Sequence, residues 1–542
     1  MAPAQPSPAI QCDYLVIGAG TAGCLLANRL SENPKNRVAL IEAGGFDDYI
    51  WIHIPVGYLY TQNNPRTDWC FKTEAEPGLN GRALNYPRGK VLGGCSSING
   101  MIYMRGQARD YDQWRQLGNP GWGWDDVLPY FKRSENYTHG SDEFHSDEGE
   151  YRVEEPRIAW DILDSFRDAA AEVGIPKITD FNRGDNEGCA YFQVNQRSGV
   201  RWNTAKAFIR PIMGRKNLNL MTETLTDRLI IENGRVVGAY VIKNGRTKEV
   251  RANREVILSA GAIGSPQILE RSGIGDPAIH QKIGVETQHE LDGVGKNLQD
   301  HLQVRLVYKV ENTVTLNEKA QSLINKAWMG VQYALFRRGP LTMAPSQLGA
   351  FAKSDPRFET ANLQYHIQPL SLDKFGDPLH DFPAITASVC NLRPTSRGTS
   401  HAQNADPAGK PVIKPNYLST DDDQQVAAES IRLTRQIMAA PALAPHNPSE
   451  YKPGPDYVDD ADLVKAAGDL GTTIFHPAGT CKMGPSDDRS AVVGPDLKLH
   501  GLTGLRIADA SVMPEIVSGN TNAPTLMIAE KTAAMVLADA NY

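Results

Sequence analysis

Gly18-Ala19-Gly20-Thr21-Ala22-Gly23 lies directly after the apolar run Tyr14-Leu15-Val16-Ile17 and directly before a helical pattern from Ala22 to Leu30. This order of strand, glycine turn and helix lets backbone amides and a helix N-terminus hold a pyrophosphate group. A second apolar run, Val38 to Ile41, leads into Glu42, whose carboxylate can accept hydrogen bonds from an adenosine ribose. The segment therefore predicts a dinucleotide cofactor, and taken alone it fits NAD as well as FAD.

A second glycine-rich segment runs from Gly261 to Gly275. It follows a buried strand predicted over residues 255–259, and Ser265-Pro266 predicts a short helix with Ser265 at its N-cap. The order of strand, glycine turn and helix is thus repeated beside the cofactor. Alternating residues over 236–243 and 247–251 predict an antiparallel flap attached to the parallel sheet.

Longer stretches of the chain carry a family resemblance. The stretch from Gly89 to Gly106 resembles the first signature of the glucose-methanol-choline (GMC) flavin oxidoreductases, and Gly261 to Gly275 resembles the second. His476-Pro477-Ala478-Gly479-Thr480 and the segment from Gly519 to Thr525 also resemble that family, in its order and spacing. Asn297-Leu298-Gln299-Asp300-His301 is similar to the bacterial choline-dehydrogenase-like and aliphatic alcohol dehydrogenase branch. The resemblance implies that the cofactor is FAD.

The resemblance also implies an α/β fold in which a Rossmann-like FAD-binding domain is interleaved with a smaller α+β substrate domain of antiparallel strands and helices. We expect residues 1–155, 200–305 and 465–542 to form the discontinuous FAD-binding domain. Residues 156–199 and 306–464 are expected to form the substrate-binding domain. Within and beside it the sequence predicts strands over 302–310 and 362–367, a helix over 424–438, and helix N-terminal caps at the acidic clusters 421–423 and 459–462.

The predicted cofactor-binding residues lie in these stretches and in the strands that lead to them. They are Gly18, Gly20, Thr21, Ala22, Gly23, Glu42, Ala43, Val91, Gly94, Ser96, Asn99, Gly100, Met101, Leu225, Asp509, Ala510, Asn522 and Thr525. Ile98 stands where covalently flavinylated relatives carry the linking histidine, so the resemblance implies that FAD is bound without a covalent bond.

The terminal helix is predicted to begin with Asn522 as its N-cap and Pro524 in its first turn. By resemblance, the N-terminus of this helix faces the negative edge of the reduced flavin, which its dipole would stabilise.

His476 and Asn520 are the predicted catalytic residues, because their segments match the family's catalytic segments. An alcohol hydroxyl is a very weak acid, so hydride leaves its carbon readily only if the oxygen loses its proton as the carbonyl forms. A neutral imidazole, with an ordinary pKa of about 6.5, is a suitable base. Asn520 can orient the hydroxyl without adding a charge. Asp300-His301 is predicted to be structural. His366 is predicted to be an ordinary strand histidine, with a place in the lining of the substrate cavity as the alternative.

The implied activity is oxidation of a primary alcohol to an aldehyde by hydride transfer to flavin N5, with His476 as the general base. The alternative is a flavin-containing lyase of the hydroxynitrile lyase type, which shares this scaffold. Three properties stay open at this point: which alcohol is used, whether oxygen or a quinone-like compound accepts the electrons, and the oligomeric state.

Composition argues against other classes of protein. The 542 residues carry a net charge of −7 with no basic run, which argues against a nucleic-acid partner. The 7 cysteines lack CxxC spacing, so no disulfide framework and no metal site is predicted. The N-terminus lacks the pattern of a secretory signal, and no apolar run has membrane-spanning length. We therefore expect a cytoplasmic protein, and peripheral attachment to a membrane through a surface helix stays open.

Overall fold

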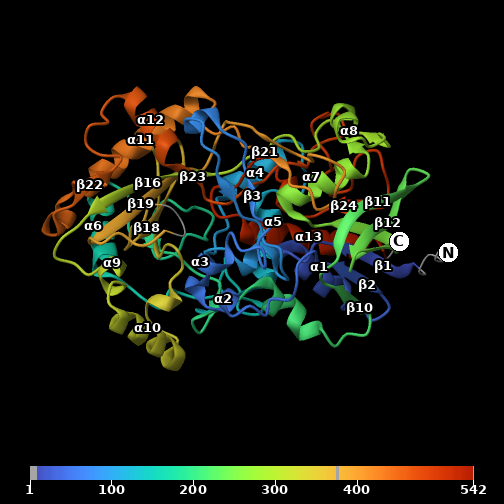
Figure 1. Cartoon of the computed structure of the whole chain (residues 1–542), viewed down its shortest axis with the longest axis horizontal. Helices are drawn as coiled ribbons and strands as arrows, with labels where there is room; N and C mark the ends of the chain where they lie inside the picture. The colour runs from blue at the N-terminus through green and yellow to red at the C-terminus, as the bar shows by residue number, and fades with distance from the viewer. Residues whose placement is uncertain (1–8, 374–376, 541–542) are drawn as a thin grey trace.

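The computed structural model describes residues 9–373 and 377–540. It contains two seven-stranded sheets, which occupy opposite halves of the molecule in Figure 1. Each sheet packs against its own cluster of buried apolar side chains. The fold is α/β with a separate, sheet-rich second half, as the sequence predicts.

The first sheet combines parallel strands with an antiparallel flap. Its parallel strands are β10 (Leu218–Met221), β2 (Val38–Ile41), β1 (Ile10–Ile17), β13 (Arg246–Leu258) and β24 (Leu505–Ile507). Strands β12 (Arg235–Lys243) and β11 (Leu225–Glu232) continue the sheet in antiparallel pairing from β13. The predicted flap is confirmed.

The carboxyl ends of the parallel strands meet at one edge of this sheet, because parallel strands all point the same way. Gly18 follows β1, Glu42 follows β2, Ser259 follows β13 and Asp509 lies just beyond β24. In doubly wound sheets this edge is where ligands bind. The topology therefore brings the predicted cofactor residues together from positions almost 500 residues apart in the chain.

The second sheet is antiparallel. Its strand order is β22 (Ser449–Lys452), β16 (Leu302–Lys309), β19 (Ala384–Asn391), β18 (Leu363–Gln368), β17 (Leu348–Ala352) and β7 (Gly188–Tyr191), with β23 (Gly471–Thr473) beside β16. The strands predicted over 302–310 and 362–367 are confirmed by β16 and β18. Strand β23 lies in the segment 465–542 that was predicted for the FAD-binding domain, yet it pairs with β16 of the second sheet. His476 follows β23 and thus lies at the junction of the two sheets.

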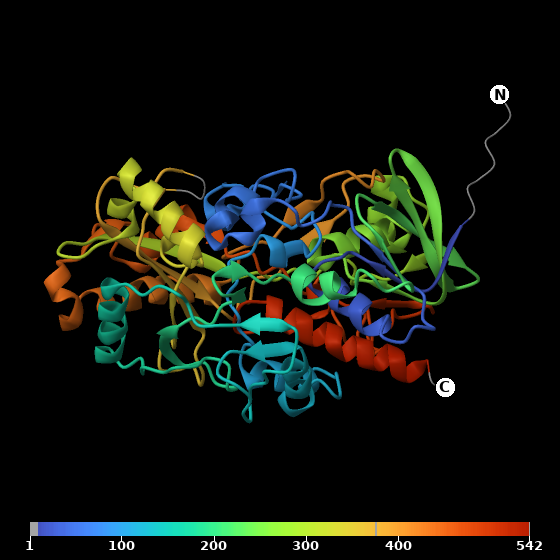
Figure 2. The same ribbon diagram turned by 90° about the horizontal axis from the view of Figure 1, so that it is seen from below.

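Helices cover both sheets (Figures 1 and 2). Around the first sheet lie α1 (Thr21–Leu30), α4 (Ala108–Gln116), α5 (Trp124–Ser134), α7 (Gly261–Arg271), α8 (Pro277–Ile283) and α13 (Asn522–Asp539). Around the second lie α6 (Asp161–Glu172), α9 (Leu316–Lys319), α11 (Asp421–Met438) and α12 (Asp460–Leu470). Helix α10 (Leu323–Phe336) lies at the outer edge of this half, and α2 (Ile50–His53) and α3 (Tyr58–Thr61) lie between the two halves. The acidic clusters occupy the first turns of α11 and α12, as predicted.

Short paired strands complete the fold. They are β3 (Phe71–Lys72) with β4 (Asn85–Tyr86), β5 (Glu135–Tyr137) with β6 (Tyr151–Val153), β8 (Gln196–Arg197) with β9 (Val200–Arg201), β14 (Ile274–Gly275) with β15 (His289–Glu290), and β20 (Thr399–His401) with β21 (Val412–Lys414).

Helix α7 begins at Gly261, four residues before the predicted N-cap at Ser265. The Ser265 hydroxyl donates to the Asp509 carboxylate at 2.6 Å and is not available as a cap. Pro266 lies inside the helix and cannot donate to the Ala262 carbonyl, but the Thr480 hydroxyl donates to that carbonyl at 2.6 Å. A side chain from a distant segment therefore allows the helix to start early.

Helix α13 begins at Asn522, so the predicted N-cap residue is the first residue of the helix and Thr521 precedes it. The Asn522 side chain accepts from the Thr21 hydroxyl at 2.8 Å and donates to the Tyr151 hydroxyl at 2.9 Å. These contacts tie the start of α13 to the start of α1, beside the first glycine turn.

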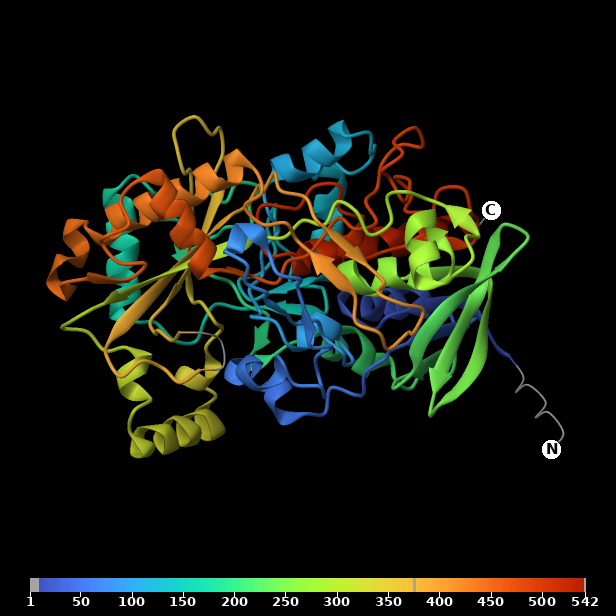
Figure 3. The same ribbon diagram turned by 45° about the horizontal axis from the view of Figure 1, so that its top comes forward.

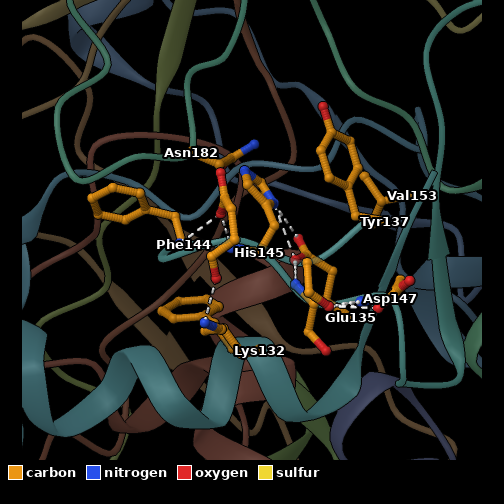
Figure 4. A network of polar contacts seen from close by, with 12 residues as sticks. Lys132, Glu135, Tyr137, Phe144, His145, Asp147, Val153 and Asn182 are labelled. Atoms are coloured by element: carbon orange, nitrogen blue, oxygen red, sulfur yellow. Dashed lines mark hydrogen bonds and ion pairs between the residues drawn. The ribbon is translucent and has the colours of Figure 1, made fainter. Parts of the chain in front are cut away.

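A buried ionic network anchors the loop after α5 (Figure 4). The Arg105 guanidinium lies 2.7 Å from Glu135, and the two ring nitrogens of His145 lie 3.1 Å from Glu135 and 2.9 Å from Asp180. Burial alone would lower the pKa of His145, but hydrogen bonds to Asp180 and Glu135 outweigh it and raise this pKa. Burial likewise opposes the charge on Glu135, yet Arg105 and His145 hold its pKa below the usual value.

Replacing His145 with glutamine is expected to lower the melting temperature more at about pH 6 than at about pH 9. Protonated His145 stabilises the fold below its unfolded pKa of about 6.5, and this contribution is lost as the pH rises through the higher folded pKa. The pKa of Glu135 is lowered in the folded protein, so its carboxylate stays ionised across this pH window. The contribution of Glu135 to stability therefore does not change between the two pH values. Loss of the buried imidazolium between Glu135 and Asp180 is expected to lower the melting temperature by roughly 3 to 6 °C at the lower pH. The measurement is thermal unfolding of both proteins, with the exposed His139→Gln as control; an equal difference at both pH values would contradict the assignment.

No helix within residues 9–373 and 377–540 is both long and apolar enough to cross a membrane. The longest, α11 and α13, have 18 residues each and carry charged side chains. The same ranges hold no group of three or more His, Cys, Asp or Glu side chains arranged to bind a metal ion.

Candidate active site

A cavity of about 290 Å³ is lined by residues of both sheets. The carboxyl-end residues of β1, β2, β13 and β24 line one part of it. His366 and Gln368 of β18, Gln303 of β16, and His476 line another. The cavity therefore joins the predicted cofactor edge to the predicted catalytic segment.

The first glycine turn leaves room at one position. A Cβ atom at Gly23 would lie 1.8 Å from the Gly18 carbonyl oxygen, and one at Gly94 would lie 2.6 Å from the Gly20 Cα. At Gly20, in contrast, the nearest protein atom would be 3.9 Å away, and Gly20 lines the cavity. The backbone around Gly20 is thus open toward the cavity, as close approach of a pyrophosphate requires. On this observation the site fits FAD.

Two buried acids hold the glycine turns that begin at Gly18 and Gly261. The Glu42 carboxylate accepts from the backbone N–H groups of Ala19 at 3.0 Å and Gly44 at 2.8 Å. Asp509 accepts from the Gly261 N–H at 2.8 Å, in addition to the Ser265 hydroxyl. Burial raises the pKa of Glu42 to about 7, against the effect of the amides. Both acids line the cavity while holding a glycine turn, and the ribose contact of Glu42 stays a prediction.

Most of the predicted cofactor residues line the cavity. They are Gly18, Gly20, Thr21, Ala22, Glu42, Ala43, Gly94, Asn99, Gly100, Met101, Leu225, Asp509, Ala510, Asn522 and Thr525. Gly23, Val91 and Ser96 lie behind this wall. Gly23 packs under Gly18, the Val91 carbonyl accepts from the Gly94 N–H at 2.7 Å, and the Ser96 hydroxyl donates to the Gly93 carbonyl at 2.7 Å. These three shape the turns, and direct contact of any of the set with FAD stays a prediction.

His476 is held by the buried carboxylate of Asp300. Asp300 accepts from the backbone N–H of His476 at 2.8 Å and from that of His301 at 2.9 Å. It also accepts from the hydroxyl groups of Tyr86, Tyr417 and Thr473. The carboxylate thereby fixes two backbone segments, one after β23 and one before β16.

His476 and Asn520, the two residues predicted to be catalytic, are in contact. Asn520 Nδ2 lies 3.0 Å from His476 Nε2, and Asn520 Oδ1 accepts from Gln364 Nε2 at 3.1 Å. The bond from Gln364 fixes the orientation of the amide, so its N–H₂ group faces the imidazole. Both His476 and Asn520 line the cavity.

The hydrogen bonds also define the tautomer of His476. His301 Nε2 lies 3.2 Å from the Leu392 carbonyl, which can only accept, so this nitrogen carries the proton. In neutral His301, Nδ1 is then an acceptor, and His476 Nδ1, at 3.1 Å, donates to it. This leaves a lone pair on His476 Nε2, the nitrogen that faces Asn520. The contact of His301 with His476 was not predicted from the sequence, which assigned His301 a structural role.

The surroundings keep His476 neutral. Burial lowers its pKa well below the ordinary value, and His301, His366 and Arg88 add to this effect. Burial likewise lowers the pKa of His301 to about 4 and that of His366 to about 3. Near neutral pH His476 is therefore a neutral imidazole whose unprotonated Nε2 accepts from Asn520 at the cavity wall.

Strand β18 contributes a polar row to the same wall. Gln364, His366 and Gln368 alternate with apolar residues and so share one face of the strand. His366 and Gln368 line the cavity, and His366 Nε2 and Gln368 Oε1 are buried with no hydrogen-bond partner in the described part of the chain. His366 was predicted to be an ordinary strand histidine, but these atoms are available to a ligand.

The comparisons agree with this architecture. Two family models described as GMC oxidoreductase match residues 12–303 and 394–529. The chain is 39% identical to the oxygen-dependent choline dehydrogenase of Photobacterium profundum, covering 97% of this chain and 93% of that protein. It is also 39% identical to an alcohol dehydrogenase [acceptor] of Pseudomonas putida, covering 97% and 95%. The crystal structure of pyridoxine 4-oxidase from Mesorbium loti superposes with a TM-score of 0.87 at 30% identity, covering 96% of this chain and 98% of that one.

Proposed function

The chain belongs to the GMC oxidoreductase family, and we propose that it oxidises an uncharged primary alcohol to the aldehyde with His476 as the general base. It is an FAD-dependent oxidoreductase that acts on CH–OH donors, as its relatives do. The observation that carries the finer proposal is the contact of a neutral, buried imidazole with an oriented amide at the cavity wall.

The two side chains divide the work on one oxygen atom. His476 Nε2 accepts the proton of the alcohol hydroxyl, and the bond to His301 keeps that nitrogen free of a proton beforehand. Asn520 Nδ2 donates to the same oxygen and holds it as its charge develops. FAD, when bound, supplies the hydride acceptor. Residues Gly18 to Thr21 and the start of α13 would hold that cofactor.

The charges around the cavity favour a neutral alcohol. Among the described residues that line it, the acids are Glu42 and Asp509, and each holds a glycine turn. The charged side chain that acts on His476 is Arg88, which is a cation. A quaternary ammonium group would therefore meet no carboxylate on the described part of the cavity wall beside the base, because Asp300 contacts the backbone of His476 and does not line the cavity. His366 Nε2, in contrast, can bind a hydroxyl, ether or carbonyl oxygen, and Gln368 Oε1 can accept from a hydroxyl.

The test compares choline with its neutral analogue 3,3-dimethylbutan-1-ol, which has nearly the same shape. In anaerobic mixing experiments we expect the neutral alcohol to bleach the flavin about tenfold or more faster at equal subsaturating concentration, because one uncompensated charge near Arg88 costs at least about 1.4 kcal/mol. Faster reduction by choline would contradict the neutral substrate. No bleaching by any alcohol of a wider panel would contradict alcohol oxidation itself. The lyase alternative predicts that outcome, and no finding described above supports it.

FAD is expected to be bound without a covalent bond, because Ile98 has no nucleophilic group at the position that carries the linking histidine in covalent relatives. Acid precipitation of the purified protein should release yellow FAD into the supernatant. Flavin that stays with the pellet, and that a peptide map places on a residue of this chain, would contradict the expectation.

A further inference from the structure

Helix α10 exposes an apolar stripe to solvent. Ile324, Trp328, Val331 and Leu335 have exposed fractions of 81%, 61%, 43% and 69%. Their spacing of i, i+4, i+7 and i+11 places them on one face of the helix. Single exposed apolar residues are common on protein surfaces, but a contiguous stripe of large ones marks an interaction site.

The stripe faces away from the body of the protein. Tyr333 is the buried residue of α10, and its hydroxyl donates to the Gly199 carbonyl at 3.1 Å. By the helical repeat, Tyr333 lies on the side opposite the stripe. Figures 1 and 3 show α10 at the outer edge of the molecule, away from both sheets. The contacts that hold the helix therefore leave its apolar face uncovered.

The charges in the segment that carries the stripe are all positive. No acidic residue occurs between Glu318 and Asp355, whereas the chain as a whole has a net charge of −7. Lys326, Arg337 and Arg338 of this stretch are exposed. An apolar face with a tryptophan and neighbouring cations is the pattern of a helix that lies in the interface of an anionic bilayer.

A second set of exposed apolar side chains lies near the cavity. Ile50 of α2 and Leu59 and Tyr60 of α3 are exposed, with fractions of 59%, 39% and 51%. The turn Pro55–Gly57 between these helices packs against Pro340–Thr342, which follows α10. Tyr58 of α3 and Pro345, just after that turn, line the cavity. The turn that follows α10 therefore packs against elements that line the chamber in which the alcohol would react.

We propose that the stripe of α10 is a peripheral docking site for a bilayer that contains anionic lipids. The helix lies parallel to the membrane plane, with Ile324, Trp328, Val331 and Leu335 among the acyl chains and Arg338 at the headgroups. The proposal goes beyond the alcohol oxidation proposed above and does not depend on it. It would allow apolar substrates or a lipid-soluble electron acceptor to reach the cavity from the membrane.

The test is co-sedimentation of the FAD-loaded protein with vesicles of phosphatidylcholine, with or without about one quarter phosphatidylglycerol. Binding is expected with the anionic vesicles and should weaken at high salt. The triple variant Ile324→Ser, Trp328→Ser, Leu335→Ser should bind these vesicles at least about tenfold more weakly than the wild type. The variant Arg338→Gln should bind anionic vesicles about fivefold more weakly and should bind vesicles of phosphatidylcholine alone as the wild type does.

The control Val458→Ser removes an apolar side chain that is 68% exposed beside α12 and should bind as the wild type does. Quenching of tryptophan emission by brominated lipids provides a second measurement, and Trp328→Phe should remove the quenched component even if the triple variant does not fold. Wild-type protein that stays in the supernatant would overturn the proposal. A wild-type dimer that the triple variant converts to monomers, without vesicle binding, would overturn it in favour of a second copy of this chain.

Discussion

His476→Ala protein is expected to remain yellow but to be reduced by alcohol about 10²- to 10⁴-fold more slowly than the wild type. That loss corresponds to roughly 3 to 5 kcal/mol of barrier, which is the usual contribution of a positioned general base. The flavin should stay bound because the Gly20 cradle lies on other elements, and the Asp300 carboxylate holds the backbone N–H of residue 476, which the substitution retains.

The measurement is the rate of flavin bleaching after anaerobic mixing, with bound FAD determined from the visible spectrum. His139→Ala is the matched control, because its side chain is 61% exposed and lies far along the chain from the pair. A variant with normal FAD content and a near-wild-type reduction rate would contradict the role of His476.

Gly20→Val protein is expected to purify folded and colourless, with no alcohol-dependent activity. A Cβ atom at this position would lie 3.9 Å from the nearest protein atom, so the backbone leaves room for a side chain and the protein is expected to fold. The side chain would, however, fill the space where the backbone is open toward the cavity, and so exclude the pyrophosphate. FAD content and the circular dichroism spectrum separate loss of cofactor from loss of fold.

Two other glycines provide the controls for that experiment. A Cβ atom added at Gly45 would have no neighbouring atom within 4 Å, and Gly45 does not line the cavity. The Gly45→Val protein should therefore keep its FAD. At Gly23 a Cβ atom would overlap the Gly18 carbonyl at 1.8 Å, so Gly23→Val should fail to fold. A yellow, active Gly20→Val protein would show that this glycine turn does not face the cofactor.

The sequence was sufficient to predict site residues that directly follow a strand or belong to a short motif. Gly18 to Gly23 follow a strand and precede a helix, and Glu42 ends the next strand, so the edge at which they meet could be predicted from the parallel topology. His476 and Asn520 were predicted from their segments, and the structure brings them to 3.0 Å.

Contacts between distant strands could not be predicted in the same way. His301 and His476 are 175 positions apart, and Gln364 and Asn520 are 156 apart, so nothing local to either partner indicates the contact. The starts of α7 and α13 were misplaced for a related reason. Ser265 and Asn522 have the composition of N-caps, but tertiary partners occupy both side chains. The outward stripe of α10 also needs the structure, because spacing alone does not tell a buried face from an exposed one.

The central claim is that His476 and Asn520 act on one oxygen atom of the alcohol. The most direct test is the rate of anaerobic flavin reduction by alcohol in wild type, His476→Ala, Asn520→Ala and the double variant, all loaded with FAD. We expect a smaller loss for Asn520→Ala than for His476→Ala, since the base remains. We also expect the increase in activation free energy in the double variant to be smaller than the sum of the increases in the two single variants, because both residues act on the same hydroxyl. Strictly additive losses would contradict the claim.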